Sequence, residues 1–239
     1  EIYADNAAIL AGDSLVTTAS SSDNGGSIQI TADKVGLFDN TSIDASGANG
    51  GGTVLVGGDQ GGKNPSVENA SRTYASGNVD INADAVTEGD GGKVIIWSDE
   101  ATEFNGNISA KGGSESGDGG FVEISGKEHL DFDGSVNVSA SSGEMGTVLF
   151  DPTDIVVSNA GAGDDGYSGG DILFAEAPPV GEPWNVSPAE LDAIVGNIIL
   201  QATDTITISD AVSLTTQGES FTAQAGGLLD VDANITTNQ

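Results

Sequence analysis

One short pattern recurs along the chain: two glycines, a variable residue, and then two apolar residues that flank a third position. A clear copy is Gly91-Gly-Lys-Val-Ile-Ile96. With its weaker copies, the pattern places its first apolar residue at positions 28, 54, 94, 122, 148, 172, 198 and 229. The intervals lie between 24 and 31 residues, except for one of 40 between positions 54 and 94. A period of this size marks a solenoid, in which each repeat must stack on its neighbours to bury its apolar face.

Each repeat contains three short segments with the character of a β-strand. The two apolar residues of the pattern are separated by one residue, which is the period of a strand and not of a helix. A second segment follows, such as Leu130-Asp-Phe132, and then a third, such as Val136-Asn-Val138 before a turn of small residues. Glycine supplies the corners because it adopts positive φ without steric cost. These features predict an all-β fold, a parallel β-helix of eight or nine coils that forms a single solenoid over residues 1–239.

Two stretches should interrupt the repeat. Residues 59–77 account for the 40-residue interval, and insertions in a solenoid often lie on the face that binds a ligand. This stretch holds the only arginine, Arg72, beside Tyr74, so both are candidate binding residues. The simpler alternative is that Arg72 pairs with a local carboxylate and pins the loop. The second stretch, 175–196, is expected to be an irregular loop followed by a short helix.

The expected helix has a clear start. Ser187 and Glu190 form a capping-box pattern around Pro188, and proline is favoured at the first helical position. Gly196 should end the helix. We expect it to be a decoration that packs on the outside of the coils.

The middle position of the pattern should face outwards, yet in five copies it is apolar. An exposed apolar stripe usually marks a contact surface. We expect the insertion 59–77 and the helix 188–195 to cover part of this stripe. Its residues are Leu55, Ile95, Leu149, Leu173 and Ile199.

The charge balance restricts the partners. The chain has 37 acidic residues against six basic ones, for a net charge of −31. Binding to a nucleic-acid backbone requires Lys and Arg to displace counterions, so this class is excluded. The simplest interpretation of the acidity is a solvated coat. The chain has no cysteine, which removes thiol catalysis and Cys-ligated metals. No segment approaches ~18 consecutive apolar residues, so we expect no span of a membrane.

Calcium is the one cofactor that the sequence suggests, because it prefers oxygen ligands and acidic Gly-rich loops can supply them. The densest such loop holds Asp164, Asp165 and Asp171, and Asp151 with Asp154 forms a second candidate site. Neither matches an EF-hand or the calcium-binding nonapeptide repeat. Solvated turns are the alternative interpretation for both.

Parallel β-helices also include polysaccharide lyases and hydrolases, whose chemistry needs clustered carboxylates or calcium with a nearby base. The acidic residues here are spread along outward positions and turns. The single histidine, His129, has no serine or second histidine in a catalytic pattern around it. No phosphate-binding loop is present, because the glycine corners lead into strands without the Gly-Lys-Ser/Thr signature.

Two stretches, Gly91–Gly113 and Gly119–Lys127, resemble the large exoproteins of two-partner secretion, the filamentous-haemagglutinin-like family and in particular its cyanobacterial type. Asn69–Tyr74, Gly146–Pro152 and Gly196–Ile208 are similar to stretches of those proteins too. The resemblance implies a right-handed parallel β-helix, exported through an outer-membrane transporter to the outer cell surface of a Gram-negative bacterium or secreted from it. Such exoproteins serve in adhesion, aggregation or matrix building.

The family's secretion domain carries an Asn-Pro-Asn-Gly motif, and only Asn64-Pro-Ser66 approaches it here. The chain therefore resembles the stalk downstream of that domain. We expect a non-catalytic structural or adhesive segment that associates with further copies or with a longer exoprotein chain, and that meets a surface polysaccharide or a cell-surface receptor. The alternative is a carbohydrate-active β-helix enzyme, which a groove with two close carboxylates and a base would favour.

Overall fold

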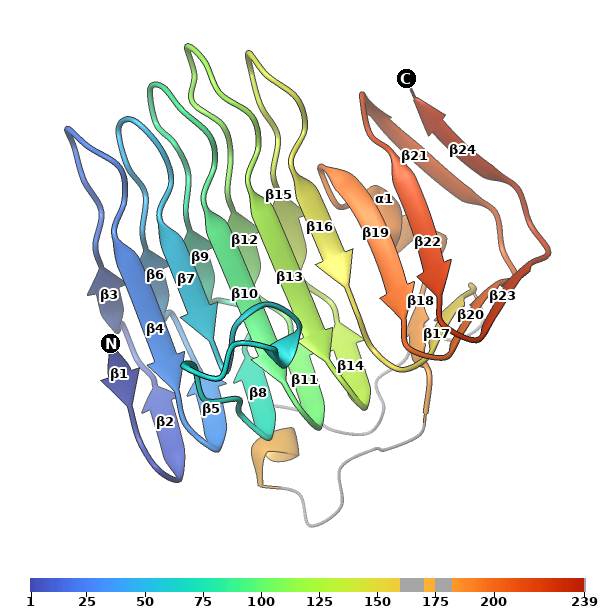
Figure 1. Cartoon of the computed structure of the whole chain (residues 1–239), viewed down its shortest axis with the longest axis horizontal. Coiled ribbons are helices and arrows are strands. Elements are labelled where there is room, and N and C mark those ends of the chain that lie inside the picture. Colours follow the sequence, from blue (N-terminus) through green and yellow to red (C-terminus); the bar gives the residue numbers. More distant parts are fainter. Residues whose placement is uncertain (160–169, 175–181, 239) are drawn as a thin grey trace.

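The computed structural model describes residues 1–159, 170–174 and 182–238, and these form a parallel β-helix (Figure 1). One face is an eight-stranded parallel sheet, the long sheet, which contains one strand from each successive coil. Its strands are, in spatial and sequence order, β1 (Ile2–Tyr3), β4 (Ser27–Thr31), β7 (Thr53–Val56), β10 (Lys93–Ser98), β13 (Phe121–Gly126), β16 (Thr147–Phe150), β19 (Asn197–Ala202) and β22 (Phe221–Ala225). The predicted all-β solenoid and its number of coils are thereby confirmed.

Two further parallel sheets complete the first five coils. The second sheet contains β2 (Ala7–Leu10), β5 (Lys34–Leu37), β8 (Arg72–Ala75), β11 (Ala101–Phe104) and β14 (His129–Phe132). The third sheet contains β3 (Leu15–Thr17), β6 (Ser42–Asp44), β9 (Asp80–Asn82), β12 (Asn107–Ser109) and β15 (Ser135–Asn137). The three strand segments expected in each repeat therefore supply one strand to each sheet.

Two smaller sheets continue the stack. The fourth sheet has the order β18 (Trp184–Val186), β17 (Ile155–Val157), β20 (Thr205–Ile208) and β23 (Leu228–Val231), and the fifth pairs β21 (Val212–Gln217) with β24 (Ile235–Asn238). The remaining elements are two 3₁₀ turns, η1 (Gln60–Gly62) and η2 (Asp171–Leu173), and one α-helix, α1 (Pro188–Asp192).

Register in the long sheet places like residues on top of one another. Val94 pairs with Val54 on one side and with Val122 on the other, and Val122 pairs in turn with Val148. All four are fully buried. Each turn of the chain therefore adds one layer to a single core, as the repeat predicted.

Two copies of the pattern are not strands of the long sheet, which corrects the prediction. Position 172 lies in the turn η2, because β16 pairs directly with β19 and leaves no edge between them. Position 229 lies in β23 of the fourth sheet, and the long-sheet strand of that coil is β22, where Phe221 pairs with Ile198.

The helix begins as predicted and ends early. The Ser187 hydroxyl accepts a hydrogen bond from the Glu190 amide and the Glu190 carboxylate accepts one from the Ser187 amide, which is a complete capping box. However, Leu191 and Ile194 belong to the main core, and Val195 bridges to Asn137 beside the third sheet. The helix is therefore part of the coil wall, and the prediction that it covers the outer stripe is wrong.

The insertion does cover part of the stripe, as predicted. Leu55 and Ile95 are buried beneath it, in a small cluster with Val67 and Trp97. The insertion ends at Ser71, because Arg72 begins strand β8. Among the described residues, no helix is long and apolar enough to cross a membrane.

A candidate binding groove on the long sheet

The insertion is held against the long sheet by one carboxylate. Asp59 Oδ1 accepts hydrogen bonds from Lys93 Nζ at 2.7 Å and from the Gln60 amide at 2.8 Å, and its Oδ2 accepts one from Asn64 Nδ2 at 2.8 Å. Burial alone would raise the pKa of Asp59, but these hydrogen bonds, that from Lys93 first, outweigh it and lower the pKa to about 2. The Lys93–Asp59 pair therefore fixes the start of the insertion to strand β10.

A second carboxylate lies beneath the insertion. The Gly61 amide donates to both oxygens of Glu123, at 3.1 and 3.3 Å, and no part of Glu123 is exposed to solvent. Burial raises the pKa of Glu123 to about 7, against the lowering effect of the Gly61 amide, and the nearby charge of Asp151 raises it further. The carboxyl group of Glu123 therefore changes its protonation state near neutral pH and not near pH 4.5.

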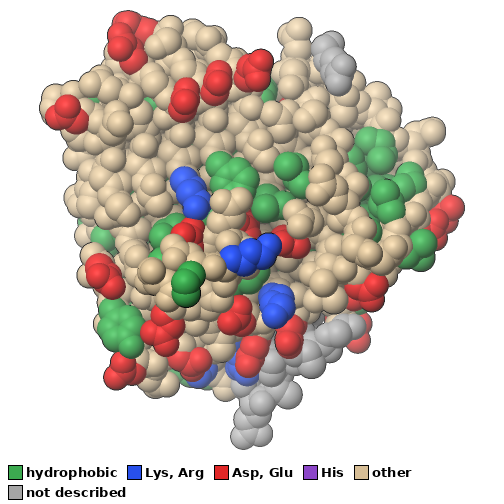
Figure 2. All heavy atoms as spheres, viewed as in Figure 1, with side chains coloured by type: hydrophobic (Ala, Val, Ile, Leu, Met, Phe, Trp, Pro, Cys, Tyr) green, Lys and Arg blue, Asp and Glu red, His purple; other side chains and the backbone are tan. Residues whose placement is uncertain are grey.

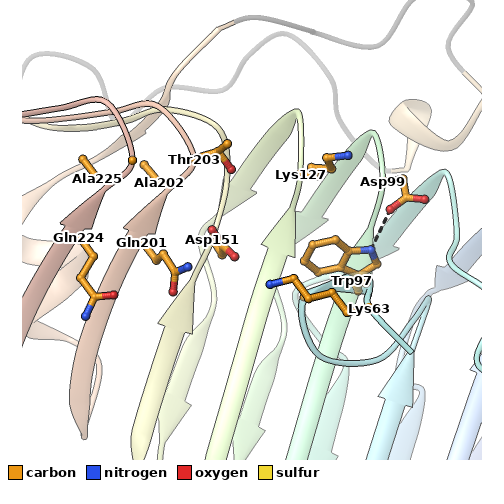
Figure 3. A pocket seen from close by; sticks show the side chains of 13 residues that line it. Lys63, Trp97, Asp99, Lys127, Asp151, Gln201, Ala202, Thr203, Gln224 and Ala225 are labelled. Atoms are coloured by element: carbon orange, nitrogen blue, oxygen red, sulfur yellow. Dashed lines mark hydrogen bonds between the residues drawn. The ribbon is translucent and has the colours of Figure 1, made fainter. Parts of the chain in front are cut away.

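A groove of about 670 Å³ opens beside the insertion (Figure 3). In a parallel sheet, the carboxyl ends of all strands meet at one edge, so residues that follow successive strands form a line along the axis of the coils. The groove follows this line from the insertion towards the last coil. It is lined by Gly61–Lys63 of the insertion, Trp97 and Asp99 of β10 and its end, Lys127 after β13, Asp151 after β16, Gln201–Thr203 at the end of β19, and Gln224–Gly226 at the end of β22.

Trp97 closes the end of the groove next to the insertion. Its side chain is buried, and its Nε1 donates to Asp99 Oδ1 at 3.1 Å. Gly62 lies so close that a Cβ atom there would approach the indole ring to 2.7 Å. Any residue with a side chain at this position would displace either the ring or the insertion.

The basic residues of the groove differ from those elsewhere. Lys34, Arg72, Lys93 and Lys111 each form an ion pair, with Asp33, Glu100, Asp59 and Asp84 respectively. In the described part of the chain, Lys63 and Lys127 have no carboxylate within ion-pair distance. Figure 2 shows basic side chains near the middle of this face with acidic side chains beside them, and both kinds again towards its lower edge.

The predicted binding residues Arg72 and Tyr74 lie on β8 of the second sheet, away from this groove, and both are buried. Arg72 Nε donates to Glu100 Oε2 at 3.1 Å and one of its terminal nitrogens donates to the carbonyl of Ile172. The Tyr74 ring packs 5.0 Å from that of Phe38. Arg72 therefore pairs with a local carboxylate, as in the simpler alternative. The segment that it holds is η2 and not the insertion.

The candidate calcium residues that the structure describes have different surroundings. Asp164 and Asp165 lie outside the described residues. Asp171 is exposed on η2, Asp151 lines the groove, and Asp154 Oδ1 accepts a hydrogen bond from the Thr205 amide at 3.0 Å. Within residues 1–159, 170–174 and 182–238, no three histidine or acidic side chains gather in a group that could hold a metal ion.

Sequence reasoning missed Lys63 and Lys127, which line the groove, and Glu123, which lies beneath the insertion. Glu123 carried a usable signal, because it occupies a middle position whose paired neighbours in the adjacent strands are Ile95 and Leu149. An acid between two apolar neighbours indicates a covered carboxylate. The lysines carried no such signal, since only the fold aligns the ends of distant strands.

Neither the protein-family models nor the curated protein sequences give a match to this chain. The class of protein is thus defined by the fold alone, a parallel β-helix whose longest sheet carries a covered stretch and, at the carboxyl ends of its strands, the groove described above. Function is inferred from these features and from the resemblance noted in the sequence.

Proposed function

We propose that this chain is a non-catalytic structural and adhesive segment of an exported β-helical exoprotein at the outer surface of a Gram-negative bacterium. The observation that carries this proposal is the continuity of the core. One hydrophobic cluster includes buried residues of every long-sheet strand from β4 to β19, and partly buried residues of β1 and β22 pack against it. Hydrogen-bonded parallel strands join each coil to the next along the same length.

Such a stack resists bending, because bending it would separate strands and open a close-packed core. Its mechanism is mechanical: it holds binding regions away from the cell. Two features support export through an outer-membrane transporter, namely the resemblance to two-partner-secretion exoproteins and a stabilisation by stacking that needs no disulfide.

The last described coil offers a surface for stacking. Leu229 and Val231 of β23 are each 45% exposed. Their partners in β20, Ile206 and Ile208, are fully buried. Ile235 of β24 is 39% exposed. A further coil, from a longer polypeptide or from a second molecule, would bury these side chains and pair with the free strand edges.

Electron microscopy and sedimentation of the purified chain over a range of concentrations test the proposal. We expect rods that lengthen in steps of one chain, and more so with calcium or magnesium, which screen the repulsion between molecules of charge −31. The double variant Leu229→Lys/Val231→Lys should remain as single rods. The control Val86→Lys, at a side chain that is 58% exposed on a lateral turn, should lengthen like the parent.

Single rods of the parent chain at every concentration would contradict end-to-end stacking. A flexible chain of coils in the micrographs, instead of straight rods, would contradict the stiff segment itself.

A carbohydrate-active enzyme is the second candidate, and a specific observation favours it. Glu123, whose pKa is raised to about 7, lies within electrostatic reach of Asp151 in a groove that also presents lysines. Against this candidate, Glu123 is fully covered by the insertion. Incubation with acidic and neutral polysaccharides, followed by assays for new reducing ends and for unsaturated products, tests it. Cleavage that Asp151→Asn abolishes would replace the non-catalytic proposal.

A further inference from the structure

Two unpaired amines face the same groove in a strongly acidic protein. Lys63 extends from the insertion and Lys127 follows β13, and Figure 3 shows both side chains at the groove. The chain has 37 acidic residues for six basic ones, and the other four basic residues are all ion-paired. Lysines without an ion-pair contact are therefore the exception in the described part of the chain, and their amines are available to an anionic ligand.

Two acids, Asp99 and Asp151, also line this end of the groove. Asp99 Oδ1 already accepts hydrogen bonds from Trp97 Nε1 and Asn69 Nδ2, both at 3.1 Å. Asp151 is half-buried, and burial raises its pKa even though Lys63 lies close enough to lower it. Lys63 and Lys127 are therefore the groups of this end of the groove that a carboxylate of a ligand would contact.

The other end of the groove is neutral and polar. Gln201 of β19 and Gln224 of β22 are paired in register, so their amide side chains lie one above the other at the inter-strand spacing of ~4.8 Å. Each amide both donates and accepts hydrogen bonds, which suits the hydroxyl groups of a sugar. Ala202 and Ala225 beside them are small and leave room for a ligand.

The groove is elongated. From β10 to β22 it crosses four inter-strand steps, a length of about 19 Å at the spacing of a parallel sheet. A site of this length favours an extended oligomer over a compact metabolite. The scarcity of exposed apolar side chains in it disfavours a lipid or an apolar ligand.

We propose that this groove binds an extended acidic saccharide whose carboxylates are separated by neutral sugars. Lys63 and Lys127 take the carboxylates, and Gln201 and Gln224 take hydroxyl groups of neutral sugars. A densely charged polyanion does not fit, because two amines cannot offset its repulsion from a protein of charge −31. The proposal goes beyond the structural role and does not depend on end-to-end stacking.

Isothermal titration calorimetry of the whole chain tests the proposal with two hexasaccharides. A hyaluronan hexasaccharide carries a carboxylate on every second sugar, and chitohexaose in its fully N-acetylated form, a hexamer of N-acetylglucosamine, is a neutral chain of the same length. We expect the hyaluronan hexasaccharide to bind more tightly than chitohexaose, and added salt to weaken its binding. Lys63→Gln and Lys127→Gln should each weaken it by about tenfold, as expected for the loss of one charge-assisted contact.

Lys111→Gln is the matched control. It makes the same change of charge at a lysine that is paired with Asp84 on the side of the third sheet, and it should bind like the parent. Gln224→Ala should weaken binding by a few fold without altering its salt dependence. Circular dichroism of each variant verifies that the fold is intact.

Three outcomes would overturn the proposal. The first is absence of hyaluronan binding by the parent at millimolar ligand. The second is equal affinity for chitohexaose, and the third is an equal loss in Lys111→Gln, which would mean a general effect of charge. Filament formation is measured separately, so failure here and failure of the stacking proposal are distinguishable.

Discussion

The coils from β4 to β15 and the stretch from β17 to α1 contain similar apolar segments, but these segments form different structures in the two regions. In the first region, each coil supplies one strand to each of three sheets in constant register. In the second, β17 is followed by η2 and then by β18, which pairs with β17 itself, before α1 leads into β19. The first region repeats, whereas the second fills one layer of the stack with several short elements.

The difference shows that a local pattern is not sufficient to make a strand. Ile172 and its neighbours match the repeat, yet the edge of β16 is already occupied by β19. Ile172 and Leu173 instead pack against Tyr74 and Ala101, on the outside of the second sheet. A strand requires both an alternating apolar pattern and a free edge of a neighbouring strand, and only the pattern is encoded in the local sequence.

The sharpest test of the regular region is Gly119→Ala. A Cβ at Gly119 would lie 1.8 Å from the carbonyl oxygen of Val138 and 2.4 Å from the amide nitrogen of Gly146, both of them backbone atoms of the same and the next coil. The coils cannot stack without moving apart, so we expect a loss of more than about 4 kcal/mol in the free energy of unfolding. Urea titration followed by circular dichroism measures it.

Gly77→Ala is the control, because a Cβ there would meet its nearest atom at 3.7 Å and Gly77 has no positive φ. It should change the free energy of unfolding by less than about 1 kcal/mol. Similar losses in the two variants would mean that close backbone approach does not control the spacing of the coils.

A pair of core truncations compares the two regions directly. The Phe132 ring lies between those of Phe104 and Phe150, at 6.3 and 5.1 Å, so Phe132→Ala should cost about 3–5 kcal/mol and lower the midpoint of global unfolding. Ile172 is equally buried but lies in the outer cluster with Tyr74. Ile172→Ala should speed hydrogen exchange around η2 and leave the global midpoint nearly unchanged. A matching fall in both midpoints would place η2 in the same cooperative unit as the core.

The insertion is a second departure from the repeat, and it buries Glu123. Its contribution to stability can therefore be tested by varying the pH. The pKa of Glu123 is about 7 in the folded chain against an ordinary value of 4.5. The unfolded chain therefore loses this proton first, and the contribution of Glu123 to stability falls as the pH rises from about 4.5 to about 7. At pH 8, Glu123→Gln should be more stable than the parent by about 3 kcal/mol, and at pH 4 the difference should vanish.

Urea titrations at several pH values measure this difference. Glu115→Gln removes the same charge from an exposed turn and should show no such dependence on pH. A constant difference between Glu123→Gln and the parent from pH 4 to pH 8 would contradict the raised pKa.

The sequence predicted the regular region well because its signals are local. Alternation within each strand and glycine at each corner define the layers, and stacking of identical layers then sets the register, as the pairing of Val94 with Val54 and Val122 shows. It also predicted that the insertion would cover part of the outer apolar stripe, which it does at Leu55 and Ile95. Both inferences needed only the assumption that each repeat resembles the last.

The groove and the irregular layer could not be predicted in this way. Lys63 and Lys127 are 64 positions apart in the chain, and only the alignment of strand ends brings them to one groove. The place of β18 depends on its pairing with β17 across a segment of more than 20 residues. Such long-range pairings have no periodic signal, because each occurs once.

The prediction with the smallest expected effect tests whether α1, in contrast to η2, unfolds together with the core. Ser187→Ala removes the hydroxyl that accepts from the Glu190 amide at 3.2 Å, and loss of such a cap costs about 1 kcal/mol. Because Leu191 and Ile194 lie in the main cluster, this cost should appear in global unfolding, as a small fall in the midpoint of one cooperative transition. Ser213→Ala, at an exposed position on β21, should leave the midpoint unchanged. A separate early transition in Ser187→Ala alone would instead group α1 with η2, as a segment that unfolds independently of the stack.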